Sequence, residues 1–367
     1  MYTGKIENGT IIGEIPAYII KSESGIVTKG AVTVLEGTFM DKTDLKTINV
    51  AFPKTITYYT AAFANSGITS IPPKINVDKA TIVAGMFMNC TGLTEIPQSF
   101  NLVNASNLTN CRYMFQDCTN LTTIPEGFAI PSSMNSVEGM FYNTKITTIP
   151  KSLNLENATN LQRCDDMFEE CTNLTTIPEG FAIPSSVTNV ADMFKNTKIT
   201  KIPDSLNLKN LNNLVHCMNM FQQSSLEELP VDFGIGPNVT SASFMFAQTK
   251  LKSLPQNFNL ESLTKLKDCS WMFHSTQISA LPDGFALPDS VTNCSGMFGS
   301  CAKLESIPDT FKLGDNMETC HKLFEKCSSL TYIPSDFRIP PKVTNIDSMF
   351  QDVKNANINN LIIPEGV

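Results

Sequence analysis

The stretch Cys118–Ser133, CTNLTTIPEGFAIPSS, occurs a second time, without a change, as Cys171–Ser186. Sixteen consecutive identities at a separation of 53 residues indicate an internal duplication. Self-similarity with a period of this order is the signature of repeat architectures, in which each unit packs mainly on its neighbours. The stretch therefore predicts that the chain is an array of repeats with further copies elsewhere in the sequence.

An apolar residue followed by Phe is the anchor of the repeat. Successive copies are 24 to 28 residues apart, and their phenylalanines are Phe63, Phe87, Phe115, Phe141, Phe168, Phe194, Phe221, Phe246, Phe273, Phe298, Phe324 and Phe350. Thr38-Phe39 is a further, degenerate copy. In each unit a Leu or Ile lies a few residues after the Phe. An Ile-Pro or Leu-Pro pair begins three residues after that Leu or Ile, as in Leu121–Pro125. Longer and shorter units alternate, which explains why the closest identity appears at 53 residues.

A unit of about 26 residues is too short to bury its own apolar face, so it must stack on its neighbours. The LTTIP segment is β-favourable, and its Pro ends the strand because Pro lacks a ladder donor. Stacked copies would pair as a parallel sheet with a spacing of about 4.8 Å. The Met-Phe pair predicts a short helical turn, and a Phe at a fixed point of every unit predicts an internal aromatic stack. The fold expected is an α/β repeat, a solenoid with a parallel β-sheet and short helical turns in about 13 units of about 26 residues.

The segments MFQDCTNLTTIP (Met114–Pro125) and SVTNVADMF (Ser186–Phe194) resemble the BspA-like leucine-rich repeats. The resemblance recurs in register from about residue 36 to the end, although the Pro after the second aliphatic residue departs from the family pattern. It implies a leucine-rich-repeat solenoid without enzyme activity. It also implies a surface-exposed protein of a host-associated microbe or protist that acts in adhesion and binding. Similar arrays occur in structural proteins of bacteriophages.

Two segments depart from the repeat. Residues 1–35 are interpreted as a degenerate N-terminal capping unit, which keeps an Ile-Pro signature at Ile15-Pro16, and residues 36–367 as the solenoid. Near the other end, either Leu361–Ile363 is a capping strand or the native protein continues.

Charge and apolar patterning exclude several classes of partner. The formal net charge is -8 and the chain has no Lys/Arg cluster, so neither nucleic acid nor an anionic membrane is an expected partner. No run of about 18 apolar residues is present, so membrane insertion is not expected. The first residues do not read as a secretory signal peptide, whereas the family implies a cell-surface or extracellular location. A cytoplasmic or virion location is the alternative.

The eleven Cys fall in two columns, four residues before or three residues after the repeat Phe. In the first column Cys alternates with Val, Ala and Ile, and in the second with Ser and Thr, which is how a small buried side chain behaves. No CxxC or zinc-type spacing occurs, so neither a metal nor another cofactor is expected, and disulfides are the alternative. His216, His274 and His321 lie in different columns, which argues against a catalytic triad. The chain is therefore not expected to be an enzyme.

The two residues between the aliphatic positions are predicted to point outward from the sheet. Before about residue 200 they form a neutral threonine ladder, and later units carry charges or an aromatic ring. The candidate ligand-binding residues are Thr122, Thr123, Thr147, Thr148, Thr175, Thr176 and Tyr332, together with Trp271, which is expected in an exposed column two residues before Phe273. The competing interpretations are a solvated face without a partner and, for Trp271, a ring packed by chance.

These observations predict a non-enzymatic binding scaffold. The first hypothesis is a microbial surface or adhesion-type protein that recognises protein or glycan ligands, because extended repeat surfaces usually bind such partners. The alternative is a structural or receptor-binding component of a bacteriophage or prophage particle. The sequence does not determine the oligomeric state.

Overall fold

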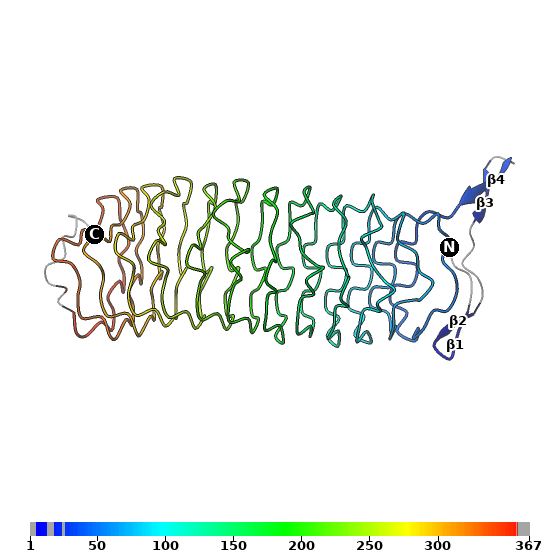
Figure 1. The fold of residues 1–367 in the computed structure, drawn as a ribbon, viewed down its shortest axis with the longest axis horizontal. Helices are drawn as coiled ribbons and strands as arrows, with labels where there is room; N and C mark the ends of the chain where they lie inside the picture. Colours follow the sequence, from blue (N-terminus) through cyan, green and yellow to red (C-terminus); the bar gives the residue numbers. More distant parts are fainter. Residues whose placement is uncertain (1–4, 13–17, 24–25, 357, 359–367) are drawn as a thin grey trace. The chain divides into compact units, whose positions relative to one another are not determined.

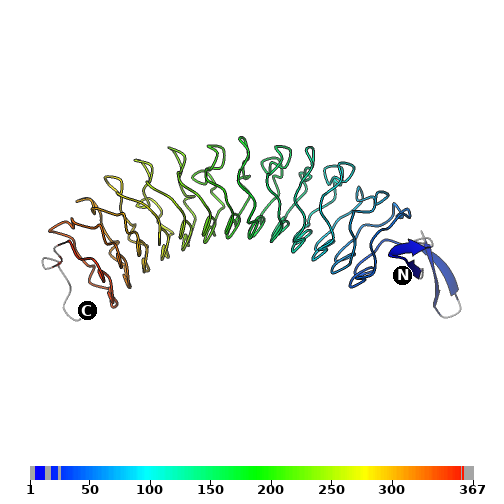
Figure 2. The same cartoon turned by 90° about the horizontal axis from the view of Figure 1, so that it is seen from below.

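The computed structural model describes residues 5–12, 18–23, 26–356 and 358, and the chain divides into two compact units, Met1–Leu174 and Thr175–Val367. Within each unit the chain winds into coils that lie side by side, and each coil carries one repeat Phe (Figure 1). The view at right angles shows the successive coils of each unit stacked in sequence order (Figure 2). The predicted solenoid-type fold is confirmed.

The named strands of the described residues all precede the first repeat Phe. β1 (Lys5–Glu7) pairs antiparallel with β2 (Thr10–Ile12), and β3 (Tyr18–Glu23) pairs antiparallel with β4 (Ile26–Ala31). The β1–β2 turn contacts the first coil, because the Gly9 carbonyl accepts hydrogen bonds from the Lys46 and Thr47 N–H groups at 2.7 and 3.0 Å. The capping role of residues 1–35 and their boundary with the solenoid stay predictions. Ile15-Pro16 and Leu361–Ile363 lie outside the described residues.

Parallel pairing between coils differs from the continuous sheet that was expected. The coils pair through isolated parallel bridges, mostly at a residue five positions before the repeat Phe. In the first unit this ladder is Val34, Tyr58, Ile82, Asn110, Ser136 and Arg163, and in the second it is Asn189, His216, Ser241, Asp268, Asn293, Thr319 and Asn345. The LTTIP segment contributes shorter ladders, Glu95 with Thr123 and Ala280 with Ser306 and Tyr332. Within a few residues of each bridge the chain turns or reaches a Pro, which cannot donate a ladder hydrogen bond. The bridges therefore do not extend into longer strands in the described coils.

The Met-Phe segment is not helical. The residues two before and two after each repeat Phe have left-handed backbone angles, for example Tyr113 (φ 56°) and Asp117 (φ 57°) around Phe115. Left-handed residues four positions apart interrupt the right-handed geometry that an α-helix needs. The described residues therefore contain turns at every position where a short helix was predicted. Among them, no helix has the length and apolar character needed to cross a membrane.

Alternate N–H groups of this turn segment bond to the next coil, and the others bond three residues back in their own turn. In one coil the inter-coil bonds run from Cys111, Tyr113, Phe115 and Asp117 to the carbonyls of Ser136, Glu138, Met140 and Tyr142, at 3.1, 2.7, 2.9 and 2.9 Å. This pattern satisfies the buried backbone without a helix. It also holds neighbouring coils in register, so equivalent side chains of successive coils face one another.

The repeat phenylalanines form the predicted internal stack. Successive rings lie nearly parallel with centroids 5.2 to 5.8 Å apart, from Phe39 to Phe168 in the first unit and from Phe194 to Phe350 in the second. A second row, Phe258, Phe285, Phe311 and Phe337, stacks in the same way and contacts the first row edge-on. Burying one such ring stabilises the fold by about 1.5–3 kcal/mol.

Candidate functional site

The outer strip consists of the two residues between the aliphatic positions of each coil. Its predicted members are all solvent-exposed: Thr122, Thr123, Thr147 and Thr148 in the first unit and Thr175, Thr176 and Tyr332 in the second. The Thr122 hydroxyl donates to the Thr94 carbonyl of the preceding coil at 3.2 Å, and the Thr331 hydroxyl donates to the Glu305 carbonyl at 3.2 Å. These bonds orient the side chains, so the strip presents groups at fixed positions.

Charged members of the outer strip pair between coils in the second unit. Lys201 contacts Glu228 at 2.5 Å, and Lys252 contacts Glu227 at 2.6 Å. The hydrogen bond with Glu228 raises the pKa of Lys201, and the hydrogen bond with Lys252 lowers the pKa of Glu227. Because three of these side chains are more than half exposed and that of Glu227 is 41% exposed, water screens these pairs and they add little to stability.

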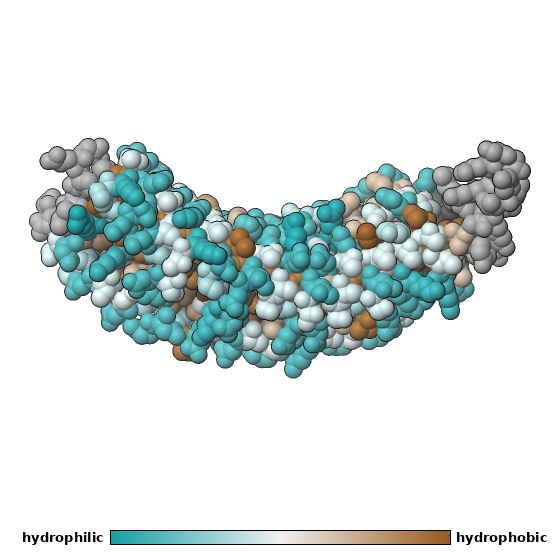
Figure 3. Space-filling view, turned by 90° about the horizontal axis from the view of Figure 1, so that it is seen from above, coloured by the Kyte–Doolittle hydropathy of each residue, from teal (hydrophilic) through white to brown (hydrophobic). Residues whose placement is uncertain are grey.

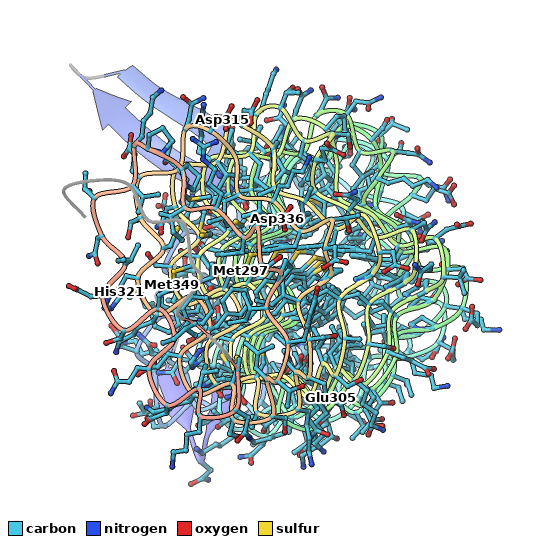
Figure 4. All side chains as sticks on the ribbon, turned by 90° about the vertical axis from the view of Figure 1, so that its left-hand side faces the viewer. Met297, Glu305, Asp315, His321, Asp336 and Met349 are labelled. Carbon is cyan, nitrogen blue, oxygen red and sulfur yellow. The ribbon has the colours of Figure 1, made fainter. Side chains whose placement is uncertain are left out.

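A groove lies beside the strip in the second unit. Residues 309–316 form one wall and residues 334–342 form the other, and the hollow between them has a volume of about 630 Å³. A second hollow of about 670 Å³ shares Lys312, Leu313, Asp315 and Asn316 with it. Figure 4, which looks along the stack, places Asp315 and Asp336 away from Glu305 of the outer strip. The groove walls carry both carboxylates and cations over an apolar floor of Phe and Pro.

The groove lies where the residues that follow two buried phenylalanines change. In earlier longer-type coils an Asn follows the buried Phe or Leu and joins two coils: Asn259 donates to the Gly284 carbonyl at 2.6 Å and accepts from the Ala286 N–H at 3.2 Å. The next longer-type coil holds Lys312 in place of this Asn, and the shorter-type coil after it holds Arg338 where Ala286 stood in the previous one; both charged side chains are exposed. The changes from FNL to FKL and from FAL to FRI are visible in the sequence, and they are the signal by which the charged walls of the groove could have been found.

Tyr332 connects the outer strip to the groove. Its ring is 48% exposed on the strip, and its hydroxyl donates to Oδ1 of Asp309 at 2.6 Å. This hydrogen bond raises the pKa of Tyr332. Asp309 lines the groove, so an aromatic face, a carboxylate and the cations of the groove are available to one ligand.

Trp271 lies elsewhere, and the expectation of an exposed column is wrong. The indole is half-buried, stacks on Phe244 with ring centroids 6.0 Å apart, and meets the His274 imidazole edge-on at 4.8 Å. Its other face covers Gly296, where a Cβ atom would lie 2.4 Å from the ring. Trp271 occupies the turn segment of its coil, and not the outer strip that holds Thr175, Thr176 and Tyr332 in the same unit.

The structure gathers three carboxylates that the sequence did not single out. Oxygen atoms of Glu138, Asp165 and Asp166 lie within 4.8 Å of one another in the first unit. Arg163 neutralises part of this charge through contacts with Asp165 at 2.7 Å and Glu138 at 3.2 Å, and the hydrogen bond to Asp165 raises the pKa of Arg163. The Tyr113 hydroxyl also donates to Glu138. An arginine already bound to two of the carboxylates makes the cluster a partly buried ion-pair network.

All eleven cysteines are buried free thiols, which confirms that both Cys columns belong to the core. In the second column the thiol donates to the carbonyl of the Phe in the preceding coil, as Cys118 does to Phe87 at 3.1 Å. Burial raises the pKa of Cys90 and Cys171 to about 11, so these thiols stay protonated at neutral pH and are poor nucleophiles.

Exposed apolar side chains are scattered. On the face shown in Figure 3, hydrophobic residues stand singly among polar ones. The most exposed large hydrophobic residues are Val34, Met40, Tyr58, Val103, Val231, Tyr332 and Ile358. The surface of the described residues therefore offers mainly polar groups and single rings.

Comparison with solved structures supports the fold. YopM from Yersinia enterocolitica has a TM-score of 0.51 and 16% identity over 89% of this chain, which spans 59% of the YopM chain. A leucine-rich repeat protein from Bacteroides ovatus has 15% identity and a TM-score of 0.45, and the alignment covers 99% of this chain and 87% of that protein. At these identities the likeness to YopM establishes the fold alone. A search of curated proteins gives no match.

Two family models match the sequence. The model described as "BspA type Leucine rich repeat region" matches residues 111–227 and 164–278. The model described as "Mycoplasma protein of unknown function" matches residues 39–150 and 287–362. The two models together span almost the whole repeat array, and residues 111–278 of the chain are leucine-rich repeats of the BspA type.

Proposed function

We propose that this protein is a non-enzymatic, adhesion-type binding scaffold on a microbial surface, and that it recognises a protein or glycan ligand. The observation that carries the proposal is Tyr332, an exposed ring on the outer strip whose hydroxyl is bonded to Asp309 of the groove wall. Aromatic rings beside oriented polar groups are typical of recognition sites. The phenylalanine stacks and the inter-coil hydrogen bonds hold these groups in place without any ligand, which lowers the entropic cost of binding.

The chemistry of the site favours binding over catalysis. The groove offers Lys312, Arg338 and Asp336 as exposed charged groups, but its lining holds no Cys or His that could act as a nucleophile or general base. The thiols of the chain are enclosed in the core. Mixed charges over an apolar floor suit a ligand with both hydrogen-bonding groups and apolar faces, as sugars and peptides have.

The test is binding of the purified chain to a printed glycan array and to intact host cells, with antibody labelling of the unpermeabilised native microbe for its location. Tyr332→Ala should lower affinity by about tenfold or more, which corresponds to about 1.4 kcal/mol. Tyr58→Ala is the matched control, because Tyr58 is 42% exposed but lies outside the strip and the groove. Equal binding by both variants, no binding by the wild-type chain, or native protein confined to cytosol or virus particles would contradict the proposal.

A further inference from the structure

Cys294 and Cys320 face each other inside the second unit. Each lies four residues before the repeat Phe of its coil, Phe298 and Phe324, and both side chains are fully buried. Their sulfur atoms are 3.7 Å apart, in thiol–thiol contact. The Cys294 sulfur also contacts the Thr319 carbonyl at 3.7 Å, as the Cys269 sulfur contacts the Asn293 carbonyl at 3.6 Å. In the same column the Cys111 sulfur contacts the Met140 sulfur in place of a second thiol.

The backbone next to this pair holds the two coils side by side. Asn293 and Thr319, the residues just before the two cysteines, form a parallel bridge, and the Cys294 N–H donates to the Thr319 carbonyl at 3.2 Å. Paired extended segments lie about 4.8 Å apart. That spacing falls within the range of about 4.4–6.8 Å between the Cα atoms of disulfide-bonded cysteines. To form the bond, the sulfur atoms must move from 3.7 Å apart to the S–S bond length of about 2.0 Å.

We propose that Cys294 and Cys320 form a disulfide bond when the chain folds in the presence of a small-molecule disulfide oxidant. The thiolate of one cysteine attacks the oxidant, forms a mixed disulfide and releases one thiol. The thiolate of the second cysteine then attacks the sulfur of the first and releases the other thiol. Two protons and two electrons leave the protein, and the oxidant is reduced to two thiols.

The bond forms during folding rather than afterwards. In the finished fold both thiols are enclosed, and burial raises the pKa of Cys294 well above its usual range, so the reactive thiolate is scarce. Before the coils close, both thiols are accessible and their ordinary acidity gives enough thiolate for exchange. The disulfide should therefore form slowly when oxidant is added to the folded, reduced protein, and efficiently when oxidant is present during refolding.

The bridge would join the two coils that carry the groove. Cys294 begins the coil that supplies residues 309–316, and Cys320 begins the coil that supplies residues 334–342. A bond between them would limit separation of the groove walls, a consequence that rests on the proposed binding function, whereas the bond itself does not. Because disulfides persist in oxidising compartments, its presence in the native protein would also report where the chain folded.

The test is refolding of the full chain from guanidinium in a mixture of reduced and oxidised glutathione, followed by alkylation, trypsin digestion and mass spectrometry. The expected product joins peptide 313–322, which contains Cys320, to peptide 268–303, and fragmentation should place the bond at Cys294. In a control digest treated with a reductant, the two peptides should no longer be joined.

Three variants sharpen the result. Cys294→Ala should abolish the joined peptides, and Ala is tolerated in this column because Ala242 occupies it in another coil. Cys269→Ala and Cys301→Ala, in the same tryptic peptide, should leave the bond unchanged. Complete alkylation of Cys320 in the refolded wild-type chain, or a bond from Cys320 to Cys269 or Cys301, would overturn the proposal. The wild-type measurement decides the question even if a variant fails to fold.

Discussion

Replacing Gly296 by Ala tests whether side chains of neighbouring coils interlock as the structure requires. Gly296 has a φ of +60°, and an added Cβ would lie 2.4–2.5 Å from three atoms of the Trp271 ring. Gly85 has the same φ of +60° at the equivalent position of another coil, but its added Cβ would meet only the Met88 Cβ, at 3.8 Å. The two glycines therefore share the backbone cost and differ in the steric cost.

The expected magnitudes follow from that difference. A non-glycine residue in the left-handed region costs about 1–2 kcal/mol, and this is the whole effect expected for Gly85→Ala. At Gly296 the indole must also move, which weakens its stacking on Phe244, and overpacking of this kind costs a further 1–3 kcal/mol or so. Gly296→Ala should therefore reduce the free energy of unfolding by about 2–5 kcal/mol.

A double-mutant cycle separates the two costs. Equilibrium guanidinium unfolding, followed by circular dichroism, is measured for the wild type, Gly296→Ala, Trp271→Ala and the double variant. With the ring removed, Gly296→Ala should cost no more than Gly85→Ala, so the coupling between the two sites should be about 1–3 kcal/mol. Equal effects of the two glycine substitutions in the wild-type background, or a coupling near zero, would refute the packing described for Trp271.

Two further predictions concern buried charge and buried thiols. Arg163→Met leaves Glu138 and Asp165 without their cation and should lower the free energy of unfolding at pH 7 by about 1–3 kcal/mol, a value discounted because the Arg163 side chain is 46% exposed. Thermal melts at pH 7 should show this loss, and the exposed Arg112→Met serves as a control with little effect. Stability should also fall as pH rises from about 8.5, where thiols of the unfolded chain ionise, toward 11, because burial raises the pKa of Cys90 and Cys171 to about 11. This stabilisation is complete below the pKa of the thiols in the unfolded chain. Replacing either Cys by Ala should reduce the slope of unfolding free energy against pH by about 1.4 kcal/mol per pH unit. An unchanged slope would contradict the burial of that thiol in the folded chain.

The repeat period was sufficient to identify which residues form the core. Phe115 and its equivalents recur at a nearly constant interval, so a side chain that is buried in one coil must be buried in all. The same reasoning placed Cys118 and the other thiols inside, since they alternate with Ser, Thr, Val and Ala at the same positions. The periodic pattern and the motif together led to the family and to the solenoid-type fold.

The backbone of the turn segment was not predictable from that pattern. An apolar pair every 26 residues or so fits one helical turn as well as the observed turn, because both bury the same side chains. The left-handed angles at Tyr113 and Asp117 decide between them, and they depend on hydrogen bonds to the next coil. The bonds from Tyr113 to Glu138 and from Asp117 to Tyr142 form only when two coils are in register.

The sequence by itself determined the repeat, the inward columns and the outward position of threonines such as Thr122, because periodicity encodes the face that a residue occupies. The tertiary structure decided which residues meet across coils. It set Trp271 over Gly296, Arg163 against Glu138, Tyr332 beside Asp309 and Cys294 against Cys320. The physical reason is that these pairs are 23 to 26 residues apart in the chain, and only the stacking register brings them together.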